Sequence, residues 1–575
     1  MKTKKLLSLI LAMAMCLGLL SACGSGSSSS SSGTSDSGDS AGSSATESEA
    51  EEASGSAEAE AEETGEDSGS SANADGDTIV LDGNYLRDKI TVSLSSDGGT
   101  LDAFTRSQWG SGVALLDLVY QKLAYEDTEG NLRWAIGESF EQVDDLTYTL
   151  TIHDNVYDSL GNHITASDIV YSFEYFISLG NTGAINRLDH LEVVDDYTLT
   201  WYCSEEFGDG DMVKNLTNCY IVSQEAYESR DMTTDPVGTG PYVVESYTAG
   251  STVILKANED FWMKDLSEEE QADLWVYCAQ NVGEIEYQII QDSSSRAIAL
   301  EMGTIDMADS LDIADIDAFE GNDDISTVSL PQTAPVAFIF NCSDDSPCAD
   351  LALRQAICYA LDNEAIADGL AVPATAVTGF QARLYDAPDD WSSGRDYYDY
   401  DLDKVTELLE ESGYNGETLT LSYSSTTAND GAALIMQSQL AAVGINVELN
   451  CLEESVLETE KYDSTKWDLR LETFGGGSYM SQVLKTFTTE DAANHLDNGE
   501  QLMLIADTTL DDLYNAIVAD PSEANAEAWD QYFTYDNCYA YALCVYDNQT
   551  AVRSDVNAAQ GTKYALMPNA STFND

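Results

Sequence analysis

Two short alternating runs joined by a turn are the clearest structural pattern in this chain. Tyr242 to Tyr247 and Thr252 to Lys256 alternate apolar and polar side chains, as half-buried strands do, and Thr248 to Gly250 between them favours a hairpin turn. The preceding Asp235 to Gly240 contains two glycines and a proline, which indicates a turn with positive or crowded φ values. The pattern predicts a two-stranded hairpin that closes at Phe261 to Trp262.

Similar patterns recur along the rest of the chain and predict a mixture of strands and helices. Strands are expected where residues alternate or where a short apolar run is bounded by turn residues, and helices where apolar residues recur every three or four positions. Between Ile285 and Asp309 the pattern predicts a strand, a helix that ends at Gly303, and a second strand. The other predicted strands are Lys89 to Ser95, Leu146 to Ile152, Asp195 to Tyr202, Val336 to Asn341, Leu419 to Tyr423 and Trp467 to Thr473, and the predicted helices are Val113 to Ala124, Gly161 to Phe176 beginning near Thr165, Leu351 to Ile366, Leu402 to Gly413 and Leu434 to Val447.

The first residues have the pattern of an export signal. Three lysines precede an apolar run from Leu6 to Leu20, which is shorter than the roughly 20 residues of a membrane-spanning helix. The following Leu20 to Gly24 reads LSACG and resembles the bacterial lipobox, in which the cysteine becomes the lipidated first residue of the mature chain. We therefore predict a signal peptide over 1–22 and lipidation at Cys23, the alternative being an ordinary cleavage site that happens to contain a cysteine.

The segment 23–77 is almost entirely Ser, Gly, Ala, Glu and Asp, with no basic or aromatic residue. Such a composition buries too little apolar surface to offset the entropy of folding. The segment is predicted to be a disordered acidic linker that tethers a folded receptor to the membrane surface.

The composition of the whole chain narrows its function. With 575 residues, of which 43% are hydrophobic, it is long enough for two or more domains and a large core. The 103 acidic and 24 basic side chains give a formal net charge of −79, which repels nucleic acids and anionic membranes. Nucleic-acid binding is therefore excluded, and membrane contact is expected through the lipid anchor only.

The order of several motifs resembles family 5 extracytoplasmic solute-binding proteins, the peptide, nickel and related receptors of ABC importers. The GTGPY hairpin carries the strongest likeness, and Leu101 to Thr105 matches the family's opening Leu-Asp-Pro segment except that Ala103 replaces the proline. The likeness extends in family order from Lys89 to Phe487. Its other segments read NLRWAIGESFE, GNHITASDIVYSFEYF, SRAIALEMGTID, LRQAICYALD and LAAVGINVEL.

This resemblance implies a bilobed, periplasmic-binding-protein-like fold (type II, family 5) that mixes α/β and α+β elements and has an extra small domain inserted in lobe one. Lobe one is expected to comprise 78–108 with 235–332 and 546–575. The inserted domain is expected at 109–234 and lobe two at 333–545.

The family places its ligand contacts on the loop after the first strand and on loops of lobe two. Trp109 and Trp391 are equally well explained as core residues, and Arg383 as a member of a surface ion pair. The candidate ligand-binding residues that the resemblance implies are Ser107, Gln108, Trp109, Arg383, Trp391, Phe474, Gly476, Ser478 and Tyr479.

One departure from the family concerns the group that holds a peptide's α-ammonium. Peptide-binding relatives carry an aspartate on the loop after the strand that matches Trp467 to Thr473, and this chain has Gly475 to Ser478 there. Because a buried ammonium without a counter-charge costs several kcal/mol, a free peptide N-terminus is disfavoured unless Glu472 or another acid replaces the missing carboxylate.

Histidine and cysteine spacing gives no sign of metal or redox chemistry. The four histidines, His153, His163, His190 and His495, lie singly, and no C-x-x-C occurs. Nine cysteines follow Cys23, and an odd count leaves at least one free thiol. Cys342 with Cys348 is the best local candidate for a disulfide, and Cys358 is expected to be a buried free thiol.

The predicted function is that of a monomeric, non-enzymatic, cofactor-free and metal-free substrate-binding lipoprotein of an ABC importer. It is expected on the outer face of the bacterial cell membrane, where it passes an oligopeptide or peptide-like solute to a permease and ATPase complex. Alternatives are a sensor not coupled to import, or a receptor for a sugar or metal chelate. A surface-anchored hydrolase is the rival class, but outside the Ser/Gly-rich segment no G-x-S-x-G, H-E-x-x-H or P-loop occurs.

Overall fold

The computed structural model describes residues 70–574 apart from 73–77, 106–112, 180–184, 186, 268–269, 272–273, 378, 381–382, 385–386, 388–397, 475–478, 490, 492–499 and 563–564. The described residues belong to one compact unit. None of the helices within these ranges has both the length and the apolar character needed to cross a membrane.

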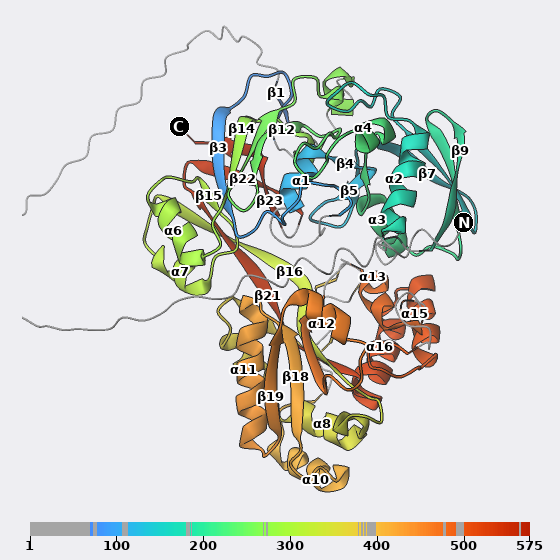
Figure 1. Ribbon diagram of the computed structural model, residues 1–575, viewed down its shortest axis with the longest axis vertical. Coiled ribbons are helices and arrows are strands. Elements are labelled where there is room, and N and C mark those ends of the chain that lie inside the picture. The colour runs from blue at the N-terminus through green and yellow to red at the C-terminus, as the bar shows by residue number, and fades with distance from the viewer. Residues whose placement is uncertain are drawn as a thin grey trace, which may run out of the picture. The chain divides into compact units, whose positions relative to one another are not determined.

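The framework of this unit is a mixed sheet of eleven strands. Two long antiparallel strands, β16 (Ile325–Phe340) and β21 (Ala540–Arg553), lie next to each other at its centre. Figure 1 shows both strands passing from a first lobe, which holds β3 and β14, into a second lobe, which holds β18 and β19. Their register shifts between Pro331 and Pro335, where the prolines have no N–H to donate. We call Pro331 to Pro335, where this pairing is interrupted on the way between the lobes, the hinge segment.

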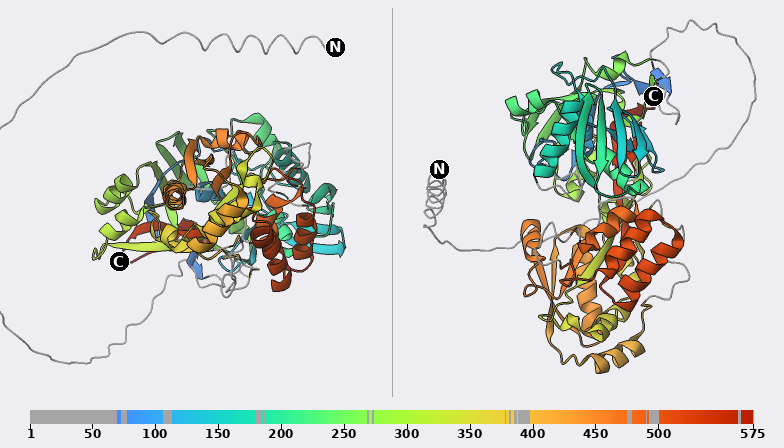
Figure 2. Two further views of the ribbon diagram at one scale, coloured as in Figure 1. Left: turned by 90° about the horizontal axis from the view of Figure 1, so that it is seen from below. Right: turned by 90° about the vertical axis from the view of Figure 1, so that its right-hand side faces the viewer.

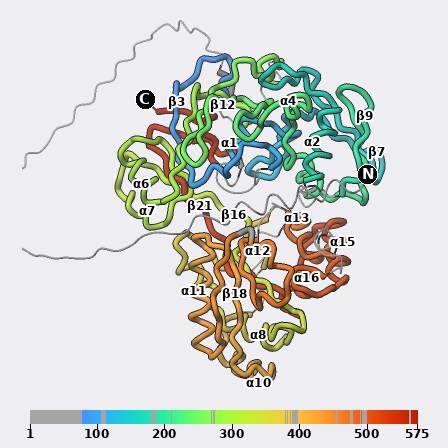
Figure 3. Tube along the Cα trace, in the orientation of Figure 1, coloured from blue at the N-terminus to red at the C-terminus, as the bar shows by residue number. Residues whose placement is uncertain are grey.

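The first lobe is built on the strand order β12, β13, β14, β3 and β15. β3 (Arg87–Leu94) is parallel to β14 (Val282–Ile289) and to β15 (Met307–Ala308). In Figure 3 the C-terminal strands (red) return to this lobe beside β3 (blue). The remaining elements of this lobe's sheet and its C-terminal hairpin are β12 (Tyr242–Thr248), β13 (Thr252–Ala257), α6 (Ser293–Glu301), α7 (Ile313–Ala318), β22 (Val556–Thr562) and β23 (Ala565–Phe573).

A separate antiparallel sheet of four strands, in the order β7, β8, β10, β9, belongs to the segment between α1 and α4. Its side chains join those of β3, β13 and β14 in one continuous hydrophobic core. The predicted division of this half into lobe one and an inserted domain stays a prediction. The elements here are α1 (Val113–Val119), β4 (Gln121–Lys122), β5 (Ala124–Glu126), β6 (Leu132–Trp134), β7 (Gly137–Asp144), β8 (Thr147–Ile152), α2 (Ala166–Ser178), β9 (Leu188–Asp195), β10 (Thr198–Cys203), α3 (Asp209–Thr217), β11 (Tyr220–Ile221) and α4 (Gln224–Ser229).

The second lobe has a hydrophobic core on each face of its part of the sheet. One core involves α8, α9 and α11, and the other involves α13, α15 and α16. The second view in Figure 2 shows this lobe (yellow to red) below the first (mostly blue to green). Its elements are α8 (Leu351–Tyr359), α9 (Asn363–Asp368), β17 (Ala374–Ala376), α10 (Leu402–Ser412), β18 (Thr418–Ser424), α11 (Thr427–Ala442), β19 (Asn446–Leu452), α12 (Glu454–Glu460), β20 (Leu469–Thr473), α13 (Met480–Leu484), α15 (Thr509–Ala519), α16 (Glu523–Asp530) and the π-helix Gln531–Asp536.

The predicted hairpin is confirmed as β12 and β13, which pair antiparallel from Tyr242 with Ala257 to Thr248 with Thr252. The two glycines before the hairpin are needed because another backbone segment approaches them closely, and neither has a positive φ. A Cβ on Gly238 would lie 2.2 Å from the carbonyl oxygen of Val119, and one on Gly240 would lie 2.4 Å from that of Leu118. These glycines therefore let the hairpin's leading turn pack on the end of α1.

Three predicted helices have the wrong extent. The helix predicted from Val113 ends at Val119, because the chain turns there into β4 and β5. The helix predicted over Leu351 to Ile366 is two helices, since Asp362 caps α9 by accepting a bond from Ala365 N at 3.0 Å. The helix predicted from Leu434 begins earlier, at Thr427, and ends at Ala442 before β19.

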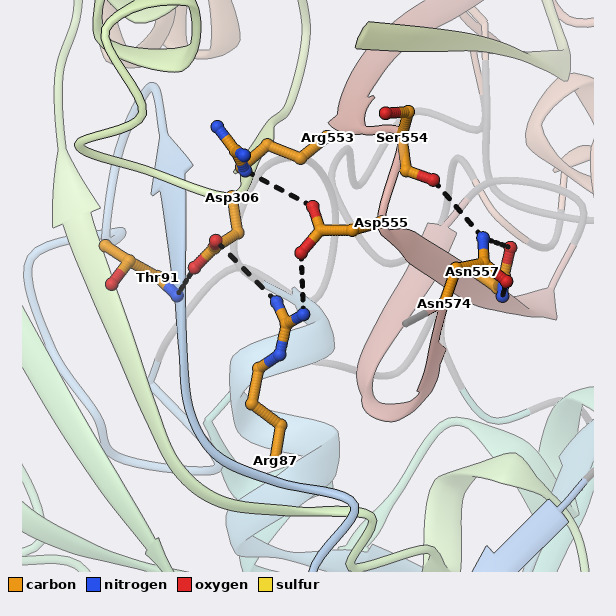
Figure 4. A network of polar contacts seen from close by, with 8 residues as sticks. All are labelled: Arg87, Thr91, Asp306, Arg553, Ser554, Asp555, Asn557 and Asn574. Carbon is orange, nitrogen blue, oxygen red and sulfur yellow. Dashed lines mark hydrogen bonds and ion pairs between the residues drawn. The ribbon is translucent and has the colours of Figure 1, made fainter. Parts of the chain in front are cut away.

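A polar network joins both ends of the described chain in the first lobe (Figure 4). Arg87 Nη2 donates to Asp555 Oδ2 at 2.7 Å, and its Nη1 lies 3.9 Å from Asp306 Oδ1. The guanidinium carbon also lies 3.8 Å from the centre of the Phe573 ring. These contacts tie β3 to the final hairpin, although Arg87 and Asp555 are 468 positions apart in the sequence.

Candidate functional site

Arg383 is held against the hinge segment. Its Nη1 donates to Asp547 Oδ1 at 2.6 Å and to the carbonyl oxygens of Gln332 and Tyr546, each at 3.3 Å. The side chains of Arg383 and Asp547 keep 27% and 24% of their exposure. The guanidinium is therefore engaged with both hinge strands and partly open to solvent, a place from which it can also face a bound anion. Its role as a ligand contact stays a prediction.

Phe474 lies on the other side of the same hinge segment. Its backbone N–H donates to the carbonyl oxygen of Pro335 at 2.9 Å. Its ring centre is 5.6 Å from that of Phe380 and 5.9 Å from that of Phe487, and the residue is 8% exposed. The Phe474 ring thus packs into the second lobe's core, while its contact with a ligand stays a prediction.

Tyr479 reaches from the second lobe to the first. It precedes α13 as its N-cap, and its hydroxyl donates to the carbonyl oxygen of Gly130 at 2.9 Å. Gln482, one turn further on, donates from Nε2 to the carbonyl oxygen of Gly210 at 2.9 Å. Both bonds join side chains of the second lobe to backbone carbonyls of the first.

The same surface is tightly packed around Gly210 in α3. A Cβ at this position would lie 2.3 Å from Ser481 Oγ and 2.8 Å from Tyr479 Cβ, so a larger side chain does not fit without movement. Nearby, Arg187 Nη2 donates to Asn515 Oδ1 at 3.0 Å. We call these residues, Gly130, Arg187 and Gly210 of the first lobe with Tyr479, Ser481, Gln482 and Asn515 of the second, the lobe contact.

Lys214, one helical turn along α3 from Gly210, is an ammonium group buried beside the lobe contact. It is 7% exposed. Its pKa is lowered to about 8, chiefly by burial and then by the positive charge of Lys485, while the carboxylates of Asp211 and Asp491 act in the raising direction. The charged groups that shift the pKa of Lys214 therefore come from both lobes.

Glu472 does not have a free carboxylate. It forms an ion pair with Arg470, two residues earlier on the same face of β20. The Arg470 side chain is 0% exposed and that of Glu472 is 21% exposed. Taking Glu472 away from this pair to hold an ammonium would leave a fully buried guanidinium without its counter-charge, which is strongly unfavourable. This pairing argues against the suggestion that Glu472 replaces the aspartate of peptide-binding relatives.

The structure brings some predicted residues together and leaves others untested. Arg383 and Phe474 both bond to the hinge segment, and Tyr479 belongs to the lobe contact. Sequence reasoning missed the other members of that contact, because their glycine and polar residues have no distinctive spacing. The remaining candidates, Ser107, Gln108, Trp109, Trp391, Gly476 and Ser478, lie outside the described residues.

Within the described ranges, no three His, Cys, Asp or Glu side chains are grouped so as to hold a metal ion. His163 has its Nε2 2.8 Å from the carbonyl oxygen of Asp154, and His190 lies beside Asp189 with 2.7 Å between Nδ1 and Oδ2. All nine described cysteines are free thiols. The suggested Cys342–Cys348 disulfide is therefore absent from the structure.

The comparisons with known proteins identify this arrangement. Residues 132–494 match the family model described as "Bacterial extracellular solute-binding proteins, family 5 Middle". The chain belongs to this family. The bilobed fold, inferred above from motif order, is thereby confirmed for this family 5 chain.

Curated relatives and solved structures agree. The glutathione-binding protein GsiB of Salmonella paratyphi A is 23% identical over 377 residues, covering 63% of this chain and 69% of its own length. The oligopeptide-binding protein AppA from Bacillus subtilis, in complex with a nonapeptide, superimposes with a TM-score of 0.67 at 16% identity, covering 85% of this chain and 100% of that one. NikA from Staphylococcus aureus, in complex with Ni(L-His)2, gives the same TM-score, identity and coverage. The fold is thus shared by receptors whose solutes differ widely in chemistry.

Proposed function

We propose that this protein captures a solute between its two lobes and presents it to the permease of an ABC importer, without altering it chemically. Family membership makes it an extracellular solute-binding protein. The observation that carries the mechanism is the lobe contact, in which hydrogen bonds from Tyr479 and Gln482 cross between lobes that two hinge strands connect. Such a contact can form and break as the hinge bends, which is how a bilobed receptor encloses and releases a ligand.

The first experiment identifies a solute and tests closure. A thermal-shift screen of free peptides, N-acetylated peptides, sugars and metal chelates is followed by small-angle X-ray scattering with the compound that gives the largest shift. The expected result is one solute per chain, a smaller radius of gyration at saturation and recovery of the solute unchanged by mass spectrometry. A modified solute would indicate an enzyme, and saturation without compaction would contradict hinge closure.

The solute class follows from the second lobe. Gly475 to Ser478 stand where peptide receptors carry their ammonium-binding aspartate, and Glu472 is paired with Arg470. A glycine run presents backbone N–H groups at close range, which favours an oxygen-rich or anionic group. We therefore propose a solute without a free α-ammonium, which is an N-blocked or cyclic peptide or a compound that is not a peptide.

Calorimetry with triglycine and N-acetyltriglycine tests this class directly. The expected result is that the free amine gives no affinity advantage. Micromolar or tighter binding of the free tripeptide that is lost on N-acetylation would overturn the proposal and restore ordinary peptide import. The variant Glu472→Gln, assayed at a temperature where its thermal unfolding curve shows a folded protein, then tests whether Glu472 holds the ammonium, because the folded variant loses such binding only in that case.

The receptor is proposed to be a monomer anchored through lipid on Cys23. The lipobox around this residue and the polar segment behind it support the proposal. Cys23→Ala should release the protein from membranes into the medium, whereas Cys16→Ala, which changes the other cysteine of the N-terminal region, should leave it anchored. Retention of the Cys23→Ala protein after salt washes would place the anchor elsewhere.

Coupling to import rather than sensing is tested in the cell. Deleting the gene should abolish uptake of the solute identified in the screen, and a variant lacking Cys23 should lower uptake because the receptor escapes from the permease. Uptake that continues unchanged in the deletion strain, together with loss of a transcriptional response to the solute, would favour the sensor.

A further inference from the structure

Two cysteines from distant parts of the chain meet in the core of the second lobe. Cys358 lies in α8 and Cys538 lies just before β21, 180 positions later, yet their sulfur atoms are 3.4 Å apart. Both residues are 0% exposed. Among the nine described cysteines, this is the pair whose sulfurs are in direct contact.

Hydrogen bonds to the backbone on both sides of the contact hold the two cysteines in place. Arg354, one turn before Cys358 on α8, donates from Nε to the carbonyl oxygen of Cys538 at 3.0 Å and from Nη2 to that of Asn537 at 2.7 Å. Its Nη1 donates to the carbonyl oxygens of Cys348 at 2.8 Å and Ala349 at 2.9 Å.

This guanidinium is 5% exposed and ties the segment before β21 to α8. Cys538 has a φ of +49°, in the left-handed region that non-glycine residues seldom adopt. The backbone at Cys538 is therefore held in an unusual conformation that directs its side chain to the partner cysteine on α8.

We propose that Cys358 and Cys538 form a disulfide bond in the mature extracellular protein. A protein disulfide has its sulfurs about 2.0 Å apart, so the two atoms need to approach by about 1.4 Å, which small rotations about the cysteine side-chain bonds supply. Cys358 and Cys538 make the sulfur–sulfur contact recorded among the described cysteines, whereas Cys342 and Cys348, which sequence proximity favoured, are related only by an electrostatic effect. The bond would cross-link α8 to the central strand β21 and hold together the core that both elements share.

The chemistry requires an oxidant, and a disulfide donor such as oxidised glutathione or a thiol–disulfide oxidoreductase supplies it. The thiolate of one cysteine attacks a donor sulfur, which gives a mixed disulfide and releases one donor thiolate. The second cysteine displaces the other donor sulfur, so the protein pair loses two electrons and the donor gains them as two thiols, which take up the two cysteine protons.

The bond is expected to form while the chain folds. Burial raises the pKa of Cys358 well above its usual value, and the neighbouring Cys538 raises it further, so Cys358 in the folded protein has little of the reactive thiolate. During folding outside the cytoplasm both thiols are accessible to a donor. Once folded, the burial that slows oxidation also protects the bond from reductants.

Peptide mapping tests the proposal on the full chain. The protein is refolded from urea with oxidised glutathione, alkylated in urea to block free thiols, digested without reductant and analysed by mass spectrometry. The expected product is one cross-linked species that joins the peptides of Cys358 and Cys538. Recovery of both peptides in alkylated form, or a link from either residue to another cysteine, would overturn the proposal.

Thermal unfolding supplies an independent readout that does not depend on a single variant folding. Wild-type protein refolded with oxidised glutathione should melt several degrees higher than protein refolded with a phosphine reductant. The Cys358→Ala and Cys538→Ala variants should lose this difference. Cys348→Ala, which removes another fully buried thiol of the same lobe, should keep it. Equal melting temperatures of wild-type protein under both conditions would count against the bond.

Discussion

Replacing Gly210 by alanine should weaken solute binding without weakening the fold. The added Cβ would lie 2.3 Å from Ser481 Oγ and 2.8 Å from Tyr479 Cβ, both across the lobe contact. Under the proposed mechanism these atoms separate when the hinge opens, so the strain is expected to act on the closed form alone. Within the open form the substitution should not destabilise the fold, because alanine is a better helix former than glycine, by up to about 1 kcal/mol in a helix interior and by less in the first turn, where Gly210 lies.

The magnitude follows from the cost of overpacking. Inserting one methyl group into a close-packed surface costs about 1–3 kcal/mol, since side chains and backbone must shift. If closure carries this cost, the dissociation constant rises roughly 5- to 150-fold, because each 1.4 kcal/mol is a factor of ten. The melting temperature of the solute-free protein should stay the same or rise.

The assay is isothermal titration calorimetry with the solute from the screen, alongside thermal unfolding of the solute-free protein. Gly137→Ala is the matched control, because a Cβ there would lie 2.8 Å from Trp134 Cε3, and its three nearest atoms all belong to the first lobe. The control should lower the melting temperature and leave the affinity nearly unchanged.

A second variant locates the strain. Ser481→Ala removes the hydroxyl that would lie closest to the new methyl group, and that hydroxyl is buried without a hydrogen-bond partner. The change alone should be nearly neutral, and in the double variant it should recover part of the lost affinity. Wild-type affinity in Gly210→Ala, or additive effects in the double variant, would refute the view that this contact forms on closure.

Three further outcomes are expected elsewhere. The pKa of Lys214 is about 8 in the folded protein and ordinarily 10.5, so between these pH values the unfolded chain binds one more proton than the folded protein. The free energy of unfolding, relative to that of Lys214→Met, should therefore rise with pH across that window. A difference in unfolding free energy that stays flat from pH 7 to 10.5 would contradict this. Glu472→Gln leaves Arg470, which is 0% exposed, without its counter-charge and should lower the free energy of unfolding in urea by about 3–5 kcal/mol. Changing both residues to leucine should leave that free energy close to its wild-type value, and equal losses of stability in the two variants would refute the argument. Arg87→Met breaks an ion pair to Asp555 at the start of the final hairpin and should lower the free energy of unfolding by about 1 kcal/mol or more. Lys89→Met removes a side chain that is 43% exposed and should change that free energy very little. Similar unfolding midpoints for the two variants would contradict this difference.

Local patterns were sufficient where a segment's structure depends on neighbours in sequence. The hairpin of β12 and β13, the helix start at Thr165 and the strand, helix and strand from Val282 to Ala308 were all predictable, because alternation, capping residues and a C-terminal glycine act within a few positions. The helix end at Val119 was missed because apolar residues continue past it, and the break after Tyr359 was missed although the cap at Asp362 is a local signal.

The sequence by itself determined the family, the bilobed fold and the order of elements, because these depend on motifs that keep their spacing along the chain. Tertiary structure decided what the polar and sulfur-bearing side chains do. It paired Glu472 with Arg470, set Gly210 against Ser481, and brought Cys358 to Cys538 instead of Cys342 to Cys348. Most of these partners are separated by more than 100 positions, and the closest are two apart on one strand face. No periodic signal encodes the two long separations, since those contacts arise only when the lobes and the central sheet are assembled in space.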